Sequence, residues 1–211
     1  MKRLSLLSVT AVAIAMAAPA VAQGPQVALT VGKPGAGPQG TTTTVLYGEL
    51  VRVSGNISSG QANQPVQLTV SPYRGTARTV SLRTDTNGEF SYAHRPTIKT
   101  GYTARVGSVA GAQEPFAFIR PKVGLRVVSA SAGRFRVTLQ AQPEHVSRVV
   151  WFQRRITQTR WANVKKVQLR ARNLSALFTA RLPRGAQRVR IFIPQTPGYL
   201  RTTSRFVLVR R

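Results

Sequence analysis

Glu144, His145 and Ser147 are residue types that carry out nucleophilic hydrolysis, and they lie close together in the sequence. A catalytic triad needs a histidine that is oriented by a buried carboxylate and lies within reach of a hydroxyl nucleophile. Three residues within four positions cannot easily converge on one another from a loop that precedes a strand. We therefore predict a turn at QPEHVS (residues 142–147) and no catalytic residues there.

The chain is poor in the side chains that most enzymes and metal sites use. It contains two histidines, five acidic residues and no cysteine. No pair among the five acids suggests glycoside hydrolysis, and two lone histidines do not suggest a metal site. The missing cysteines exclude disulfides and thiolate chemistry, and no G-x-x-x-x-G-K-[ST] motif is present. We predict no catalytic, cofactor-binding or metal-binding residues, and hence no enzyme.

The segment TDTNGEF (residues 84–90) has the alternating oxygen-bearing residues of a calcium loop. A calcium ion takes about six to eight oxygen ligands, whereas the acids available here are Asp85 and Glu89. Asn87 and Gly88 favour the positive φ angles of a tight hairpin turn. A hairpin turn is the prediction for this segment.

The stretch QRRITQTRWANVKK (residues 153–166) combines five basic side chains with a tryptophan and no acid. We expect strands near 147–154 and 160–170 that are joined by ITQTR. If Val150 and Phe152 point inward, Trp151 and Gln153 point outward. A tryptophan beside an arginine can stack on the cation, or it can form a platform for a sugar ring or a base.

The candidate contact residues for a polyanion or a glycan are basic or aromatic side chains of the second half of the chain. They are Trp151, Arg154, Arg155, Arg160, Trp161, Lys165, Arg134, Arg136, Arg188 and Arg190. The alternative is a solvated face whose arginine stems cover apolar surface while their heads stay in water. Outward charges also discourage aggregation through sheet edges.

Positive charge is concentrated in the second half of the chain. Residues 23–120 carry nine Lys or Arg and four acids, a net charge of +5, whereas residues 121–211 carry twenty and one, a net charge of +19. Such a surface attracts polyanions at low salt, and anionic cell-envelope polymers are the expected partners. An Arg-rich coding bias is the alternative origin of the charge. Sequence-specific nucleic-acid binding is not predicted, because none of its standard motifs is present.

The first 22 residues have the organisation of a signal peptide. Lys2 and Arg3 precede an apolar run that is too short for a good membrane span, and Ala20-Val21-Ala22 fits a signal peptidase site. We expect residues 1–22 to be removed, no transmembrane segment to remain, and the mature chain to be secreted or to stay in the cell envelope.

Alternation of apolar and polar residues predicts an all-β fold. Val66, Leu68 and Val70 share one face, for example, and no stretch has a helical period. Expected strands lie near 26–31, 45–54, 65–71, 78–84, 89–94, 101–107 and 115–119, and near 123–129, 134–140, 147–154, 160–170, 175–182, 187–193 and 204–210. Spacings of roughly 8–12 residues indicate β-sandwiches. We predict two domains, 23–120 and 121–211, that arose by internal duplication and form a stiff rod because Pro121 joins two strands directly.

The segments GELVRVSGNI, PVQLTVSP, TDTNGEFSY, RPTIKTGYTARV and PFAFIRPKVGL resemble the Ig-like or fibronectin-III-like modules of secreted bacterial proteins, especially actinobacterial ones. VVWFQRR, RWANVKKVQL and ALFTARLPRG in the second half resemble a further copy. The resemblance implies tandem Ig-like β-sandwiches that act as spacers, adhesion units or glycan-contacting accessories. We expect a non-enzymatic, structural or adhesive envelope protein. The alternatives are a carbohydrate-binding accessory module and, less favoured, a small hydrolase.

Overall fold

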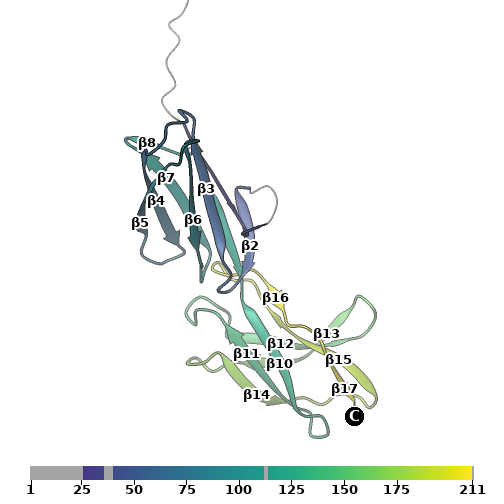
Figure 1. Ribbon diagram of the computed structural model, residues 1–211. Coiled ribbons are helices and arrows are strands. Elements are labelled where there is room, and N and C mark those ends of the chain that lie inside the picture. Colours follow the sequence, from purple (N-terminus) through teal and green to yellow (C-terminus); the bar gives the residue numbers. More distant parts are fainter. Residues whose placement is uncertain (1–25, 36–39, 112–113, 211) are drawn as a thin grey trace, which may run out of the picture.

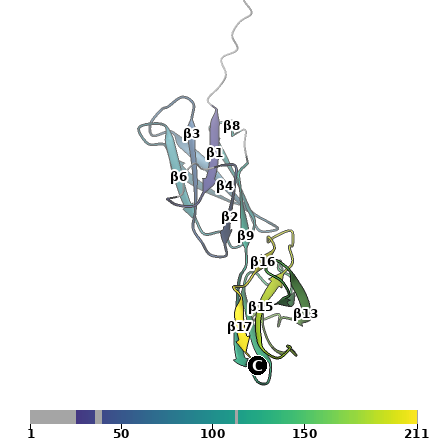
Figure 2. The ribbon, with the colours of Figure 1, turned by 90° about the vertical axis from the view of Figure 1, so that its right-hand side faces the viewer.

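The computed structural model describes residues 26–35, 40–111 and 114–210, and its regular elements are β-strands (Figure 1). The predicted signal peptide lies outside the described residues. Within the described residues, no helix has the length and apolarity needed to cross a membrane. The chain forms two tandem Ig-like β-sandwich domains that lie end to end (Figures 1 and 2).

The first domain consists of two sheets. Its strands are β1 (Val27–Gly32), β2 (Thr42–Leu46), β3 (Val51–Ile57), β4 (Pro65–Pro72), β5 (Arg78–Arg83), β6 (Glu89–His94), β7 (Thr100–Val106), β8 (Val109–Ala110) and β9 (Phe116–Arg120). One sheet has the order β1-β3-β6, and the other has the order β2-β9-β7-β4-β5 with β8 beside β7. Neighbouring strands are antiparallel except β2 and β9, which are parallel.

The second domain repeats this arrangement. Its strands are β10 (Lys122–Ser129), β11 (Arg134–Gln140), β12 (Val149–Arg155), β13 (Trp161–Gln168), β14 (Ser175–Thr179), β15 (Ala186–Ile193), β16 (Thr202–Thr203) and β17 (Val207–Arg210). The sheet β10-β11-β14 corresponds in strand order to β1-β3-β6, and β13-β12-β15-β17 corresponds to β5-β4-β7-β9. The two domains thus share an Ig-like strand order, while the internal duplication stays a prediction.

The hydrophobic core of each domain is formed by the side chains that alternate inward along the strands. Val66, Leu68 and Val70 of β4 are almost fully buried, whereas the side chains between them are less buried. In the second domain Phe135, Phe152 and Phe178 come from different strands and pack together, with ring centroids 4.7–5.6 Å apart. Burial of large aromatic side chains supplies much of the stability of a small domain.

The single strand predicted over 45–54 is wrong, because the chain turns between β2 and β3. Gly48 has a φ of 75° in this turn, a conformation that favours glycine. The amide of Glu49 donates to the carbonyl of Leu46, and the Glu49 carboxylate accepts from the Leu46 amide. The two strands then enter different sheets. Period two alone cannot detect such a turn when apolar residues flank it on both sides.

The hairpin predicted at Asn87-Gly88 is also wrong, although a turn is present. Gly88 has a φ of 75°, and its amide donates to the carbonyl of Asp85. An Asp85 carboxylate oxygen accepts hydrogen bonds from the amides of Asn87 and Glu89. The flanking strands β5 and β6 belong to different sheets, so this turn connects the two layers of the sandwich.

The end of the chain is likewise divided. The strand predicted over 204–210 begins later, as β17 at Val207, and the short strand β16 precedes the predicted range. Ser204, which is buried, lies between β16 and β17. The Ser204 hydroxyl accepts from the amide of Ile191, and its own amide donates to the carbonyl of Ile191. In place of the predicted seven strands in each half, residues 26–35, 40–111 and 114–210 contain nine strands in the first domain and eight in the second.

The two domains meet through Tyr199 as well as through Pro121. The Tyr199 side chain is 2% exposed, and burial raises its pKa to about 12, so the phenol remains a hydrogen-bond donor. Its hydroxyl donates to the carbonyl of Thr97 in the first domain (2.5 Å) and accepts from the amide of Gln142 in the second (2.8 Å). A further side-chain bond joins Gln142 Nε2 to Thr97 Oγ1 (2.8 Å).

Backbone hydrogen bonds complete this junction. The amide of Lys99 donates to the carbonyl of Gly198 (3.1 Å), and the amide of Leu200 donates to the carbonyl of Ile119 (2.9 Å). A Cβ at Gly198 would lie 3.0 Å from Ile98 Cδ1, so glycine permits close contact between the domains there. These bonds join backbone segments of the two domains and restrict rotation about the linker.

We predict that Tyr199→Phe destabilises the protein by about 1–3 kcal/mol, because it leaves the Gln142 amide and the Thr97 carbonyl unpaired in a buried site. Urea unfolding would measure the change. Tyr47→Phe is the matched control, since Tyr47 packs against the core without a hydroxyl hydrogen bond in the described structure, and it should cost less than about 0.5 kcal/mol. Equal effects of the two substitutions would contradict the role of the Tyr199 hydroxyl.

Gly55→Ala is predicted to destabilise the first domain by about 1–3 kcal/mol through overpacking. A Cβ at Gly55 would lie 2.4 Å from Phe90 Cζ and 2.6 Å from the Ala28 carbonyl oxygen, and that backbone atom cannot rotate away. Gly124→Ala is the control, because its Cβ would meet only the rotatable Thr138 Oγ1. A small effect of Gly55→Ala in calorimetry would show that β1 and β3 can move apart without cost.

Candidate functional site

The outward side of strands β12, β13 and β15 gathers aromatic and basic side chains into one surface, which we call the aromatic–arginine face. Val150, Phe152, Val167, Val189 and Ile191 of these strands are buried in the core, so the alternate positions point outward. The face consists of Trp151, Gln153, Arg155, Trp161, Asn163, Lys166, Arg188, Arg190 and Phe192. The three strands belong to the larger sheet of the second domain (Figure 1).

A β-bulge determines which way Trp161 points. The register of β12 with β13 shifts between Phe152 and Gln153, so that Phe152 pairs with Lys165 while Gln153 pairs with Asn163. One extra residue in a strand reverses the alternation of the residues beyond it. Trp161 therefore lies on the outward side, opposite Arg155. Without the bulge, strict alternation from the buried Val167 would turn Trp161 toward the core.

Arg190 on this face is held by Trp161 and Gln153, and Gln153 is held in turn by Asn163. Its guanidinium carbon lies 4.0 Å from the centroid of the Trp161 ring. Its Nε donates to Gln153 Oε1 (2.9 Å), and Gln153 Nε2 donates to Asn163 Oδ1 (2.9 Å). A cation stacked on a tryptophan gains roughly 0.5–2 kcal/mol, depending on its desolvation. The side chain of Arg190 is thus fixed in position before any ligand binds.

The charge of Arg190 has no acidic partner among the described residues, where the ion pair found is Lys33 with Glu49 in the first domain. Burial lowers the pKa of Arg190, because the charged form loses water. A guanidinium remains protonated even so. The site therefore presents a partly dehydrated, immobilised cation, which favours an anion.

Gln153 was predicted to point outward, and it does lie on the outward face, but it is only 9% exposed. Its amide is used within the protein, since both of its polar atoms bond to Arg190 and Asn163. Gln153 therefore positions Arg190 instead of meeting solvent.

Of the other predicted basic residues of the hairpin, Arg155 is held by the hairpin's own backbone. ITQTR forms the connection between β12 and β13, as predicted. Arg155 Nε donates to the carbonyl of Thr157 (3.0 Å), and Arg155 Nη2 donates to the carbonyl of Gln158. Arg154 Nη1 approaches Gln187 Oε1 (3.4 Å), and Arg160 is exposed at the end of the connection.

Lys165 and Lys166 face opposite ways, as their adjacency predicts. Lys165 Nζ donates to the carbonyl of Thr179 (2.7 Å) on β14, so this lysine joins the two sheets at their edge. Lys166 is exposed and pairs with Trp151 on the aromatic–arginine face. Arg188 lies over the ring of Phe206, with its guanidinium carbon 5.1 Å from the centroid.

The predicted contact residues do not form one surface. Arg134 and Arg136 lie on β11, on the outward side of the opposite sheet, where Arg136 pairs with Arg126 and with Leu177. Sequence reasoning missed Asn163, Lys166 and Phe192 as members of the aromatic–arginine face. Alternation within β15 was a sufficient indication for Phe192, whereas the position of Asn163 depends on the bulge.

The residues that suggested hydrolysis have structural partners. The amide of His145 donates to the carbonyl of Gln142, which confirms a turn at QPEHVS. The Ser147 hydroxyl donates to the carbonyl of Val149 (2.8 Å). The His145 ring contacts the Tyr73 ring edge-on, with centroids 5.9 Å apart. This geometry does not place the imidazole and the hydroxyl together.

The other histidine, His94, accepts or donates one hydrogen bond, between its Nδ1 and the hydroxyl of Tyr102 (3.0 Å). Burial, together with the positive charge of Arg78, lowers the pKa of His94 to about 4. Burial also raises the pKa of Tyr102, so the phenol stays protonated and can donate to a neutral imidazole.

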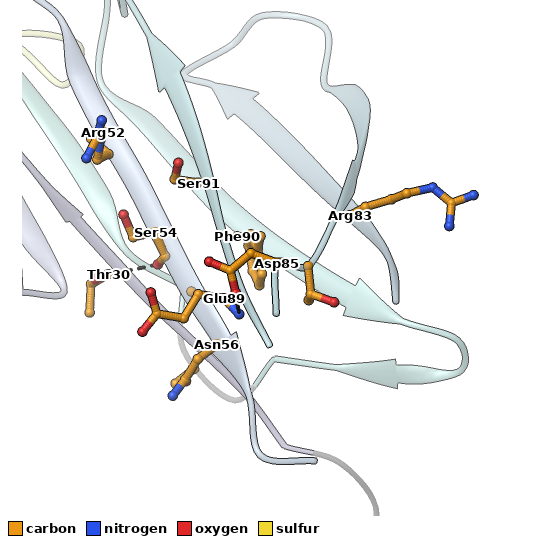
Figure 3. A pocket seen from close by; sticks show the side chains of 12 residues that line it. Thr30, Arg52, Ser54, Asn56, Arg83, Asp85, Glu89, Phe90 and Ser91 are labelled. Carbon is orange, nitrogen blue, oxygen red and sulfur yellow. Dashed lines mark hydrogen bonds between the residues drawn. The ribbon is translucent and has the colours of Figure 1, made fainter. Parts of the chain in front are cut away.

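The first domain has an open polar groove on the outward side of the sheet β1-β3-β6 (Figure 3). Thr30, Ser54 and Ser91 contribute hydroxyls, and Thr30 Oγ1 donates to the Ser54 carbonyl (3.3 Å). Asp85 borders the groove, but its carboxylate is engaged in the turn described above. Figure 3 shows Arg83 pointing away from the hydroxyl groups. Among the described residues, no group of three or more acids, histidines or cysteines that could hold a metal ion is found.

No protein-family model matches the sequence, and a comparison with curated proteins gives no match. Among solved structures, the chain is similar to a tetra-tandem repeat in the extending region of a large adhesion protein, with 17% identity and a TM-score of 0.39 over 89% of this chain and 50% of that chain. It thus spans half the length of that structure.

Two further structures are similar to the chain. The D0–D1 domain of intimin has 13% identity and a TM-score of 0.34 over 87% of this chain and 98% of that one. The FN1–FN3 domains of chicken CNTN1 have 12% identity and a TM-score of 0.28 over 82% and 71%. These likenesses are distant, and the fold is defined by the strand pairing of the chain itself.

Stability is predicted to fall as the pH decreases from about 6.5 to about 4. In this window the unfolded chain binds a proton at His94 while the folded chain does not, because the folded pKa is the lower one. The loss is roughly 1–3 kcal/mol. Urea unfolding at several pH values would measure it.

His94→Asn tests this assignment, because an amide oxygen can accept from Tyr102 and does not titrate. The variant is expected to show a flatter pH dependence between pH 6.5 and 4 than the parent protein. An unchanged slope would assign the proton to a different group.

Proposed function

We propose that this chain is an exported, non-enzymatic protein of the bacterial cell envelope with a structural or adhesive role. We further propose that its second domain binds anionic envelope polymers through the aromatic–arginine face. The N-terminal signal sequence supports export. The observation that carries the binding proposal is the immobilised Arg190, whose charge is stacked on Trp161 and has no acidic partner among the described residues.

Two physical effects act together at this face. The net charge of +19 on residues 121–211 attracts a polyanion over about a Debye length, which is roughly 8 Å at physiological salt. At contact, a guanidinium forms paired hydrogen bonds with a carboxylate or a phosphate. Because Arg190 is already ordered and partly dehydrated, less side-chain entropy and less hydration are lost on binding.

A carbohydrate-binding accessory module is the second candidate, and the observation that favours it is the pair Trp151 and Phe192. These partly exposed rings are cross-strand neighbours on the outward side of the sheet, and such rings can stack against a sugar. One side of the Trp161 ring is already occupied by Arg190. The polyanion therefore has the better-prepared site.

A hydrolase has weaker support. The charged neighbour that influences His94 is Arg78, not a carboxylate, and the Ser147 hydroxyl bonds to its own strand. A general base that is oriented by an acid is the arrangement that acyl transfer needs.

Arg190→Gln is predicted to lower retention of the mature protein on immobilised heparin and on lipoteichoic acid more than Arg136→Gln does. Both substitutions remove one positive charge, but Arg136 lies on the opposite sheet. If one anionic contact is lost, the slope of log affinity against log salt should fall by about 1 for Arg190→Gln. Elution at a series of salt concentrations would measure both variants.

Trp161→Ala should reproduce part of the Arg190→Gln effect while the net charge is unchanged, because Arg190 loses the ring that orders it. Equal retention of Arg190→Gln and Arg136→Gln would mean that binding depends on net charge alone. Flow-through of the parent protein at low salt would exclude the polyanion proposal, and stronger binding to a neutral glycan column would favour the accessory module.

A further inference from the structure

A pocket lies at the junction between the two domains, away from the aromatic–arginine face. Its volume is about 190 Å³. The first domain contributes the end of β4, the start of β5, the end of β6 and the segment that leads into β7. The second domain contributes Gln142 and His145 from the turn before β12. The domain contacts around Tyr199 hold these two walls together.

The first wall of the pocket is cationic. Arg78 Nη2 donates to the Tyr92 hydroxyl (2.8 Å), which fixes the guanidinium beside His94. Arg95 is anchored through a bond from Nη1 to the carbonyl of Gly48 (3.0 Å). Neither arginine forms an ion pair with an acid among the described residues.

The second wall offers hydrogen-bonding groups and a ring. The rings of Tyr73 and His145 meet edge-on across the junction, with centroids 5.9 Å apart. Gln142 Nε2 donates to Thr97 Oγ1, which leaves the amide oxygen of Gln142 as an acceptor. Val70, Pro72 and Ile98 add apolar side chains to the lining.

Charge and size restrict the ligand that this pocket fits. None of its thirteen lining residues is acidic, and Glu144, next to His145 in the sequence, is exposed outside the lining. Two anchored guanidinium groups favour a carboxylate. The volume is below the roughly 300–1,000 Å³ of pockets for drug-sized ligands, and it suits a single sugar ring. The hydroxyl, amide and imidazole groups can bond to sugar hydroxyls.

We propose that the junction pocket binds one carboxylated sugar residue, with its carboxylate on Arg78 and Arg95 and its ring against Tyr73 and His145. The ligand touches both domains, so its binding would also stabilise their relative orientation. This site is independent of the proposed polyanion face, which lies on other strands.

The two histidines of the chain both line this pocket, which provides a direct measurement. The imidazole signals of the tag-free mature protein are followed by NMR during titration with sodium D-glucuronate at constant pH and ionic strength. Parallel titrations use D-glucose and sodium acetate. Saturable shifts of both histidines are expected with glucuronate, at concentrations at least about tenfold lower than with either control.

Matched variants assign the carboxylate contact. Arg78→Gln is expected to weaken glucuronate binding about tenfold or more, whereas Arg83→Gln, at the other end of the same strand, should leave it unchanged. Arg190→Gln should also leave it unchanged, which separates this site from the polyanion face. The amide spectrum of each variant reports whether the fold is intact.

Any one of the following results would overturn the proposal. The first is the absence of histidine shifts with glucuronate. The second is binding of a control ligand as strong as that of glucuronate. Equal binding of glucose would show that the carboxylate is not needed, and equal binding of acetate would show that the sugar ring is not needed. The third is equal weakening by Arg78→Gln and Arg83→Gln. Loss of glucuronate binding in Arg190→Gln would move the site to the second domain.

Discussion

The buried hydroxyl of Tyr199 is the constraint on which the arrangement of the molecule depends. A phenol in this position needs a donor and an acceptor, and it finds one in each domain, the Gln142 amide and the Thr97 carbonyl. Both partners are backbone groups, so the bonds restrain the chain itself instead of a flexible side chain. The junction pocket exists because this contact keeps the turn at 142–147 against the loop before β7.

The aromatic–arginine face shows how a basic surface becomes more than a solvated one. Most of the arginines in the second domain are exposed, and the solvated alternative describes them well. Arg190 differs because the bulge turns Trp161 beneath its guanidinium and because Gln153 accepts from its Nε. Arg190 loses hydration and side-chain mobility when the protein folds, so less hydration and less side-chain entropy are lost when an anion binds.

Much of the fold was accessible from the sequence, because burial on one side of a sheet imposes a period of two. Inward positions such as Val66, Leu68, Val150 and Phe152 were identified correctly. The errors occur where a turn or a β-bulge interrupts the alternation and the residue types in the sequence do not reveal it. The turn at Gly48 joins two strands that read as one, and the bulge opposite Gln153 brings Asn163 to the outward side.

Candidate residues were harder to group than to find. Alternation indicates that Arg136 and Arg190 both point outward, but it does not indicate which sheet each occupies, and they belong to opposite sheets. The junction contacts could not be foreseen either, since Thr97 and Tyr199 are separated by 102 positions and neither neighbourhood has a strong pattern. Contacts of this range follow from the topology and not from local preference.

The parallel pairing of β2 with β9 has a mechanical meaning. β9 leads through Pro121 into the second domain, while β2 is reached from the opposite end of the chain, and five residues of each strand are in register. Tension applied along the molecule would therefore pull these strands past each other, so that their hydrogen bonds resist together instead of opening one after another. The covalent path along the first domain therefore passes through a strand pair that is loaded in shear.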